Sequence, residues 1–128
     1  MWNKCGMART KQTLTEAIND LTKLKKEFWK DVKVPGESNE YNEELAKAGR
    51  VADFIELGIL FAKDGLERQE SCGGHFREEF QTKEGEAQRK KEFQFVSAWE
   101  HVGEPQDAIL HKEELIYNNI EVKERSYK

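Results

Sequence analysis

The sequence predicts a mainly α protein, in which two long amphipathic helices are followed by an extended tail with a small antiparallel β ribbon. Three observations support this: apolar residues recur at helical spacing between residues 14 and 32, residues 43–70 contain no proline, and helical periodicity stops after Gly73 and Gly74. The 128 residues suffice for one compact domain, so we expect residues 1–128 to form a single unit. Within it, residues 1–75 are expected to form a helical bundle and residues 76–128 the extended or β tail.

The first predicted helix begins near Thr10, because Thr10 or Thr13 can cap its N-terminus. Residues 13–16, Thr-Leu-Thr-Glu, also have capping-box spacing. Pro35 and Gly36 end the helix, since proline disfavours helical geometry at the residue before it and glycine permits a turn. One face of the helix is apolar and needs a partner surface: Leu14, Ala17, Ile18, Leu21, Leu24, Phe28 and Val32.

The second predicted helix runs from about Glu43 to about Glu70. Asn42 can cap it, and Glu43 and Glu44 place acids at the positive end of the helix dipole. Its middle is apolar over more than half of its circumference: Ala48, Val51, Ala52, Phe54, Ile55, Leu57, Ile59, Phe61, Ala62 and Leu66. Such a helix is covered on several sides, by its own bundle or by another domain.

Two glycines inside the second helix, Gly58 and Gly65, fall on the same side of it. Each costs roughly 1 kcal/mol relative to alanine in a helix. Two interpretations remain open. The glycines either allow another part of the backbone to approach closely or are simply tolerated.

The region after the second helix has a different character. Residues 82–91 are highly charged, which predicts an exposed loop. Alternating aromatic and polar residues predict a strand over residues 93–99, and residues 103–107 form a turn signal. We expect residues 108–112 to return antiparallel, and residues 116–122 to give a further extended piece.

Composition excludes several classes of function. The net charge is −4, and lysines such as Lys23, Lys25, Lys26 and Lys30 alternate with acids, which predicts a solvated helix face and no nucleic-acid partner. No stretch approaches the roughly 20 apolar residues that cross a bilayer, so no direct membrane contact is expected. Hydrophobic residues make up 37 % and charged residues 36 %, a core-poor balance. The protein therefore either shows much polar surface or completes its burial against a partner.

Cysteine and histidine chemistry offers alternatives. Cys5 and Cys72 could form one disulfide or remain free thiols. Cys72 and His75 could begin a metal site, with Cys5, His101 or His111 as further ligands, or act as a nucleophile and base. Structural zinc generally needs four ligands, often from two closely spaced pairs, and a nucleophile needs an orienting acid and an oxyanion pocket. The sequence specifies neither, so we predict no catalytic, cofactor-binding or metal-binding residue.

The order of these signals resembles a known family. Residues 5–10, Cys-Gly-Met-Ala-Arg-Thr, precede a leucine-rich helix, and the long helix ends in residues 70–79, Glu-Ser-Cys-Gly-Gly-His-Phe-Arg-Glu-Glu. This order is similar to the C-terminal domain of the flavoprotein subunits of succinate dehydrogenase and fumarate reductase and to their relative aspartate oxidase. The end of the chain, with Arg125 and Tyr127, looks like the family's terminal Arg-x-Tyr. The similarity covers essentially the whole chain.

Two positions depart from the family pattern. Cys72 stands where the family usually has arginine, and Lys90 and Lys91 lie in a loop that commonly carries Arg-Asp-Asp. These departures put in doubt the ion pairs that the family positions would make.

The resemblance implies a three-helix, spectrin-repeat-like bundle followed by the extended tail. It also implies a fragment of a longer flavoprotein subunit, with Met1 to Gly6 as the remnant of a preceding helix. The parent would interconvert succinate and fumarate through FAD in anaerobic or aerobic electron transport, whereas the fragment would bind no cofactor, since it lacks a Gly-x-Gly-x-x-Gly loop. Implied partners are the flavin-binding and capping domains of the same subunit, with the iron–sulfur subunit as a further candidate. The complex would lie on the cytoplasmic face of the inner membrane.

The predicted docking site is the turn that follows the second helix, with Ser71, Gly73, Gly74, His75 and Arg77 as its candidate residues. Glycines allow close backbone contact with another domain, and the histidine and arginine supply directed hydrogen bonds. The alternative interpretation is a helix cap whose histidine and arginine tie the tail to the bundle.

Three functional hypotheses remain, and each predicts a different surface. A severed structural domain should expose an apolar patch, whereas a free-standing helical adaptor should present a groove for a partner helix. A small thiol or metal enzyme should bring Cys72 and His75 together with a carboxylate. Five aromatic residues of the tail either pack on the bundle or, if exposed, mark an interface: Phe76, Phe80, Phe93, Phe95 and Trp99.

Overall fold

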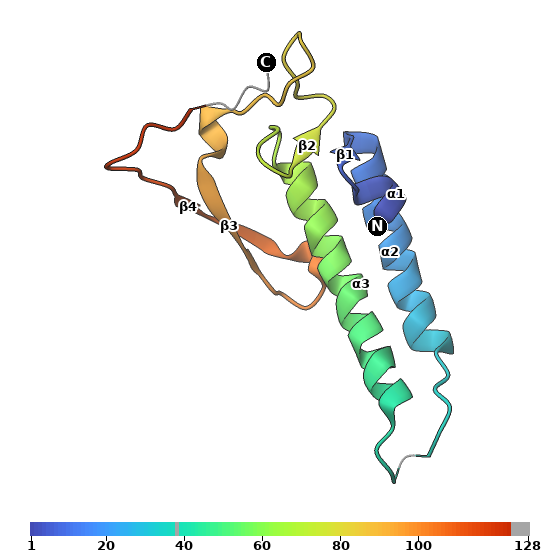
Figure 1. Cartoon of the computed structure of the whole chain (residues 1–128). Coiled ribbons are helices and arrows are strands. Elements are labelled where there is room, and N and C mark those ends of the chain that lie inside the picture. Colours follow the sequence, from blue (N-terminus) through green and yellow to red (C-terminus); the bar gives the residue numbers. More distant parts are fainter. Residues whose placement is uncertain (38, 124–128) are drawn as a thin grey trace.

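Two long antiparallel helices dominate the fold, α2 (Lys11–Asp31) and α3 (Glu43–Glu67), which lie side by side in the computed structural model (Figure 1). The structure describes residues 1–37 and 39–123. A third helix, α1 (Trp2–Cys5), is a single turn packed against α2. The predicted mainly α fold is therefore confirmed. None of the helices in the described part is long and apolar enough to cross a membrane.

Helix α2 begins where its capping residues place it. Thr10 is the N-cap, and its Oγ1 accepts a hydrogen bond of 3.0 Å from the backbone N–H of Thr13. The Thr13 hydroxyl oxygen accepts in return from the backbone N–H of Thr10, also at 3.0 Å. Of the two predicted caps, Thr10 is the one used, and Thr13 completes the capping box from the third helical position.

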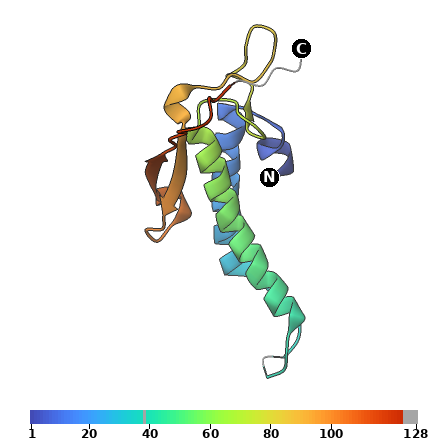
Figure 2. The ribbon, with the colours of Figure 1, turned by 60° about the vertical axis from the view of Figure 1, so that its left-hand side comes forward.

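The core lies in the half of the hairpin nearest α1. Its buried apolar residues are Cys5, Leu14, Ala17, Ile55, Ile59, Ala62 and, from the tail, Ala108. The predicted stripe of α2 is only partly buried, since Leu24 and Val32 are 46 % and 42 % exposed. The cause is visible in Figure 2, where the far end of the hairpin extends beyond the tail and α1.

Helix α3 starts at its predicted cap, because the Asn42 side chain accepts a hydrogen bond from the N–H of Leu45. Its predicted end near Glu70 is wrong by three residues, since the helix stops at Glu67 and Arg68 is extended. Contacts from beyond the helix, described below, stop it there.

The glycines of α3 differ in their surroundings, although Gly58 and Gly65 are both buried. A β-carbon built on Gly58 would lie 3.2 Å from Leu21 Cδ1, a tight contact. A β-carbon built on Gly65 would meet Leu14 Cδ2 at 3.5 Å, an ordinary packing distance. A close approach therefore exists at Gly58 but not at Gly65, and it is made by side chains rather than by another part of the backbone.

The predicted ribbon is present as β3 (Phe95–Glu100) and β4 (Ile109–Glu114), which pair antiparallel. Phe93 does not belong to it, because Lys91–Phe93 forms a short 3-10 turn. The predicted turn between the strands contains a second 3-10 turn, Pro105–Asp107. Residues 116–122, predicted as a further extended piece, form no helix and pair with no strand.

Polar side chains fix the ribbon to the helices. Trp99 Nε1 donates to Asp64 Oδ1 at 2.9 Å. Lys63 Nζ donates to two carbonyl oxygens, of Gln106 and Ala108, at 2.7 Å each. Lys25 pairs with acids of α3 and of the ribbon turn, at 2.9 Å and 2.8 Å. The prediction that Lys25 belongs to a purely solvated face is thus wrong.

A second, very short ladder joins the two ends of the helical part. The strands β1 (Ala8–Arg9) and β2 (Phe76–Arg77) pair in parallel. This ladder places the segment before α2 directly beside the turn after α3. The terminal Arg-x-Tyr tail at Arg125 and Tyr127 lies outside the described residues.

Candidate functional site

The predicted docking turn folds as a tight loop at the C-terminal end of α3. Cys72 and His75 exchange backbone hydrogen bonds of 2.8 Å and 3.0 Å. Gly73 has a φ of +58°, in the left-handed region that favours glycine. Cys72, Gly73 and Gly74 are exposed, so this tip is the accessible part of the turn.

Ser71 and Arg77 close the base of the loop and are 1 % and 2 % exposed. The Ser71 hydroxyl oxygen accepts from the Arg77 backbone N–H at 2.8 Å and donates to the Arg77 carbonyl at 3.1 Å. The Ser71 N–H donates to the carbonyl oxygen of Gln88 at 2.9 Å. The contacts of Ser71 therefore lie within the chain.

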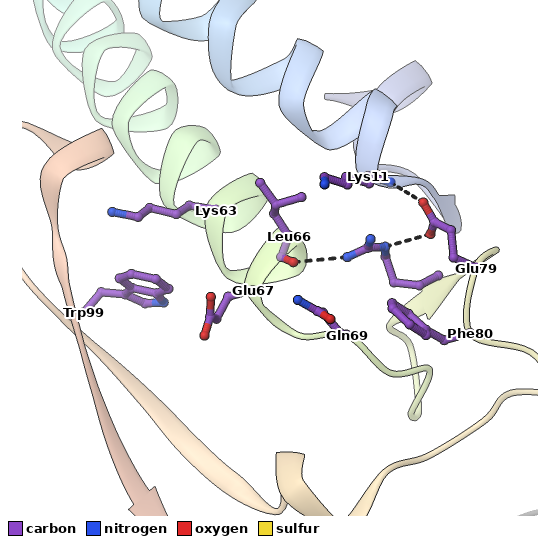
Figure 3. Close-up of a pocket in the computed structure, with 9 residues that line it drawn as sticks. Lys11, Lys63, Leu66, Glu67, Gln69, Glu79, Phe80 and Trp99 are labelled. Carbon is purple, nitrogen blue, oxygen red and sulfur yellow. Dashed lines mark hydrogen bonds and ion pairs between the residues drawn. The ribbon is translucent and has the colours of Figure 1, made fainter.

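The guanidinium of Arg77 caps α3. Its Nη1 donates to the carbonyl oxygens of Gly65 and Leu66 at 2.9 Å and 3.2 Å, and its Nε donates to Glu79 Oε2 at 3.1 Å. Dashed lines in Figure 3 mark the contacts that reach Leu66 and Glu79. The last carbonyls of a helix lack partners within it, and a cation near the C-terminus also favours the helix dipole. Arg77 thus supplies hydrogen-bond donors for the last carbonyls of α3. Residues 43–70 alone predicted the end of this helix three residues too late, because Arg77 lies outside them.

His75 connects three segments through its two ring nitrogens. Nδ1 lies 3.0 Å from Arg9 Nη1, and Nε2 lies 3.0 Å from the carbonyl oxygen of Arg68. Because a guanidinium can only donate and a carbonyl can only accept, the ring is neutral, with its proton on Nε2. Burial lowers the pKa of His75, and the nearby arginines Arg9, Arg77 and Arg68 act in the same direction.

A buried carboxylate anchors the charged loop. Glu70 is 2 % exposed; it accepts from Arg68 Nη1 at 3.1 Å and from the backbone N–H of Lys90 at 2.9 Å. Arg68 also donates to carbonyl oxygens of the tail, at Phe93 and Phe95. Lys90 makes its contact with Glu70 through the main chain. This contact therefore does not depend on the side chain at position 90, where the sequence departs from the family pattern. The contact between Glu70 and the Lys90 main chain could not be predicted from sequence, because the two residues are twenty positions apart.

The metal and thiol hypotheses find no geometry to support them. Residues 1–37 and 39–123 contain no group of three or more His, Cys, Asp or Glu side chains that could hold a metal ion. Cys5 and Cys72 are both free thiols. Both nitrogens of His75 are already engaged, and His111 pairs with Glu100 on the ribbon.

Two of the cavities that border the turn differ in character. One, of about 440 Å³, lies between the ribbon and the turn and is drawn in Figure 3 with Lys63, Trp99 and Phe80 on its walls. Acids and lysines share its lining, so it has no single charge preference. The other, of about 610 Å³, is mostly apolar and lies on the α1 side, lined by Met1, Trp2, Cys5, Gly6, Met7, Arg9, Phe61 and Gly74.

The apolar cavity opens onto exposed hydrophobic surface, the α1/α3 patch, defined here as Trp2, Met7, Phe54, Leu57 and Phe61. Trp2 and Met7 are 91 % and 90 % exposed. The three α3 residues are also exposed and follow one another at spacings of three and four, so they share one face of the helix. Exposed apolar side chains beside a mostly apolar cavity are typical of an interaction site. The five tail aromatics, in contrast, are all half-buried against the chain itself.

The architecture is that of a mainly α accessory domain: a helical hairpin closed by a buried serine–arginine turn and flanked by a ribbon. The chain belongs to the family described as the fumarate reductase flavoprotein C-terminus, whose profile matches residues 1–127. This confirms the resemblance to the C-terminal domain of that flavoprotein subunit. A free-standing adaptor is not favoured.

A solved structure has the same fold. It is that of the E. coli quinol fumarate reductase protein FrdA, in mutant form, with a TM-score of 0.79 and 21 % sequence identity. The similarity covers 97 % of this chain and 20 % of that chain, so the present chain spans about a fifth of the length of that relative. A search of curated proteins found no match.

Proposed function

We propose that this chain is the non-catalytic docking domain of a longer flavoprotein subunit, and that this parent subunit interconverts succinate and fumarate. The observation that carries the proposal is the α1/α3 patch, since a domain separated from its parent should expose apolar surface where the two meet. Family membership supports the choice of parent, and the matched structure belongs to a chain about five times as long.

The turn after α3 contributes to docking through its exposed tip. Gly73 and Gly74 allow another backbone to approach closely, and Gly74 also lines the apolar cavity beside the patch. Ser71 and Arg77 serve the site indirectly, since their buried hydrogen bonds fix the shape of the loop. His75 lies between the exposed tip and the buried base of the turn, and it is half-buried and hydrogen-bonded to Arg9.

The parent would supply the cofactor and the remaining partners. FAD belongs to the parent, because the described residues offer no glycine-rich loop between a strand and a helix, and the Gly73–Gly74 pair is followed by β2. The patch would face the flavin-binding or capping domain of the same subunit, and the iron–sulfur subunit is a further candidate partner. In the assembled complex the domain would lie on the cytoplasmic side of the inner membrane.

The N-terminal turn of helix offers a way to complete the bundle. In the parent, α1 would continue a helix that precedes residue 1 and packs along the hairpin, which would give the three-helix, spectrin-repeat-like arrangement that the family resemblance implies. Residues 1–128 would then act as one domain. The short α1 and its contacts with α2 support this proposal.

The direct test mixes the purified chain with a flavoprotein subunit truncated before the corresponding position, and measures association and regained succinate or fumarate turnover. We expect binding and at least partial recovery of activity. Trp2→Ser should weaken association at least tenfold, because Trp2 is the most exposed aromatic residue of the patch. Ile116→Ser removes a similarly exposed apolar residue of the tail and serves as the matched control. Absence of association, or equal loss in both variants, would contradict the proposal.

A further inference from the structure

One guanidinium organises the wall of the apolar cavity. Arg9 Nε donates to the carbonyl oxygen of Gly6 at 2.9 Å, and Arg9 Nη1 donates to His75 Nδ1 at 3.0 Å. The same guanidinium lies over the ring of Phe61, 4.7 Å from its centroid. Arg9 thereby ties the segment that carries Trp2 and Met7 both to α3 and to the turn. The shape of the α1/α3 patch depends on the position of this side chain.

The hydrogen bond between Arg9 and His75 requires a neutral imidazole. A protonated ring carries N–H donors at both nitrogens and leaves no acceptor for Arg9. Protonation would also place a cation beside three arginines. The charged and titratable groups around the ring are Arg9 from β1, Asp64 from α3, Arg68, Glu70 and Cys72 from the turn, and Arg77 from β2.

The nearby carboxylates are engaged by groups other than the ring. Glu70 is engaged by Arg68 and by the Lys90 N–H, and Asp64 accepts from Trp99. Arg68 and Arg77 are paired with Glu70 and Glu79, whereas Arg9 directs its guanidinium at the ring itself. The surroundings therefore favour the neutral ring.

We propose that His75 is an acid-sensitive latch on the docking surface. As the neutral ring it holds Arg9 over Phe61, and on protonation it releases Arg9 and weakens the hold on residues 1–9, which carry two of the five patch residues, Trp2 and Met7. The inference rests on the proposed function for its biological meaning, since it assigns a control to the same surface. Its physical content, the opening of one segment in acid, concerns the chain alone.

The direction of the effect follows from the surroundings of the ring. Burial lowers the pKa of His75 below its ordinary value of about 6.5. The latch is therefore closed at neutral pH, and it opens as the pH falls through the lowered pKa. At pH values above that pKa, each further unit of acidification increases the protonated fraction by about tenfold.

The two cysteines allow the opening to be measured within one molecule. Cys5 belongs to the segment of residues 1–9, is buried in one cluster with Leu14, Ala17 and Ala62, and lines the same cavity as Arg9, whereas Cys72 is exposed. Reaction with 2,2′-dithiodipyridine, resolved by peptide mass spectrometry, gives the ratio of Cys5 to Cys72 modification. Use of the ratio largely cancels the effect of pH on thiol reactivity, because Cys72 reports it in the same sample.

We expect the Cys5 to Cys72 ratio to rise by up to about tenfold per pH unit between pH 7.5 and pH 5. His75→Gln should abolish the rise, since its amide can accept from Arg9 and donate to Arg68 without titrating. His111→Gln changes an exposed histidine of the ribbon and should retain the rise. Far-UV circular dichroism on the same samples excludes global unfolding as the source.

Two results would overturn the inference: a ratio that does not change with pH in the wild-type chain, or the same rise in His75→Gln. Neither result bears on docking, because no flavoprotein is present in this experiment. Failure of association at neutral pH with a normal thiol response would instead reject the docking function alone.

Discussion

Arg77 shows how one side chain can decide where a helix ends. Its Nη1 reaches the carbonyl oxygens of Gly65 and Leu66, its Nε pairs with Glu79, and the residue is 2 % exposed, so its charge is buried among partners. The sequence indicated that Arg77 would make directed hydrogen bonds, but left open whether to another domain or to the bundle. The partners lie eleven and twelve residues upstream, so they become evident only once the turn has folded.

Replacement of Arg77 should be costly for this reason. We expect Arg77→Met to lower the free energy of unfolding by about 2–4 kcal/mol, because two helix-end carbonyls lose their buried donor. Arg50→Met is the matched control, since Arg50 is exposed on the same helix, and should change stability by less than about 0.5 kcal/mol. Urea denaturation followed by circular dichroism measures both. Equal effects would show that Arg77 does not cap α3.

His75 gives a pH dependence whose sign can be worked out. Its pKa in the folded chain is lowered by burial, whereas in the unfolded chain it is about 6.5. The unfolded chain therefore binds the proton first, and stability is lost as the pH falls from about 6.5 towards the lowered pKa. We expect urea midpoints of the wild-type chain to fall over this interval and those of His75→Gln to stay nearly constant there. Identical profiles would contradict the assignment of a neutral ring.

At the scale of elements, local sequence determined where helices begin better than where they end. Thr10 and Asn42 cap α2 and α3 as predicted, since a cap depends on residues within one turn of it. The alternation of residues 93–99 predicted β3, although Phe93 joined a 3-10 turn. The β1–β2 ladder could not be predicted, because two residues carry no periodicity. The extended piece predicted over 116–122 joins no sheet, because β propensity does not supply a pairing partner.

The Thr10 cap can be tested against a neighbouring threonine. Thr10→Ala removes the side-chain acceptor for the first turn of α2 and should cost about 1 kcal/mol of unfolding free energy. Thr15→Ala removes a hydroxyl that bonds back to the carbonyl of Lys11 within the helix, and should cost less than about 0.5 kcal/mol. Thermal and urea unfolding report the difference. A larger loss in Thr15→Ala than in Thr10→Ala would show that Thr10 is not the N-cap of α2.

The packing at Gly58 can be tested by comparison with Gly49. Within α3, replacing a glycine by alanine should raise the unfolding free energy by about 0.5–1 kcal/mol where the new β-carbon has free space around it. Gly49→Ala should show this gain, since a β-carbon there has no neighbour within 4 Å. Gly58→Ala should gain less or lose stability, because its β-carbon crowds Leu21 Cδ1 and lies 3.4 Å from Met1 Sδ. Equal gains at the two positions would argue against the close approach.

At the scale of the whole molecule, the core-poor composition has a direct structural counterpart. The hairpin buries apolar residues near α1 and leaves others exposed towards its far end and on the α1/α3 patch. The sequence predicted that burial would be completed by the bundle or by a partner, but not which face would remain open. That face depends on where α1 and the ribbon pack, and both positions are set by contacts between residues distant in sequence, such as the bond between Trp99 and Asp64.

The most direct measurement of the central claim is hydroxyl-radical footprinting of the chain, alone and bound to the truncated flavoprotein. Trp2 and Met7 carry reactive side chains and are almost fully exposed in the chain alone, and Tyr117 of the tail is an exposed reference outside the patch. The account predicts that binding strongly suppresses oxidation of Trp2 and Met7 and leaves Tyr117 unchanged. Unchanged oxidation of Trp2 and Met7 in a complex that protects Tyr117 would contradict it.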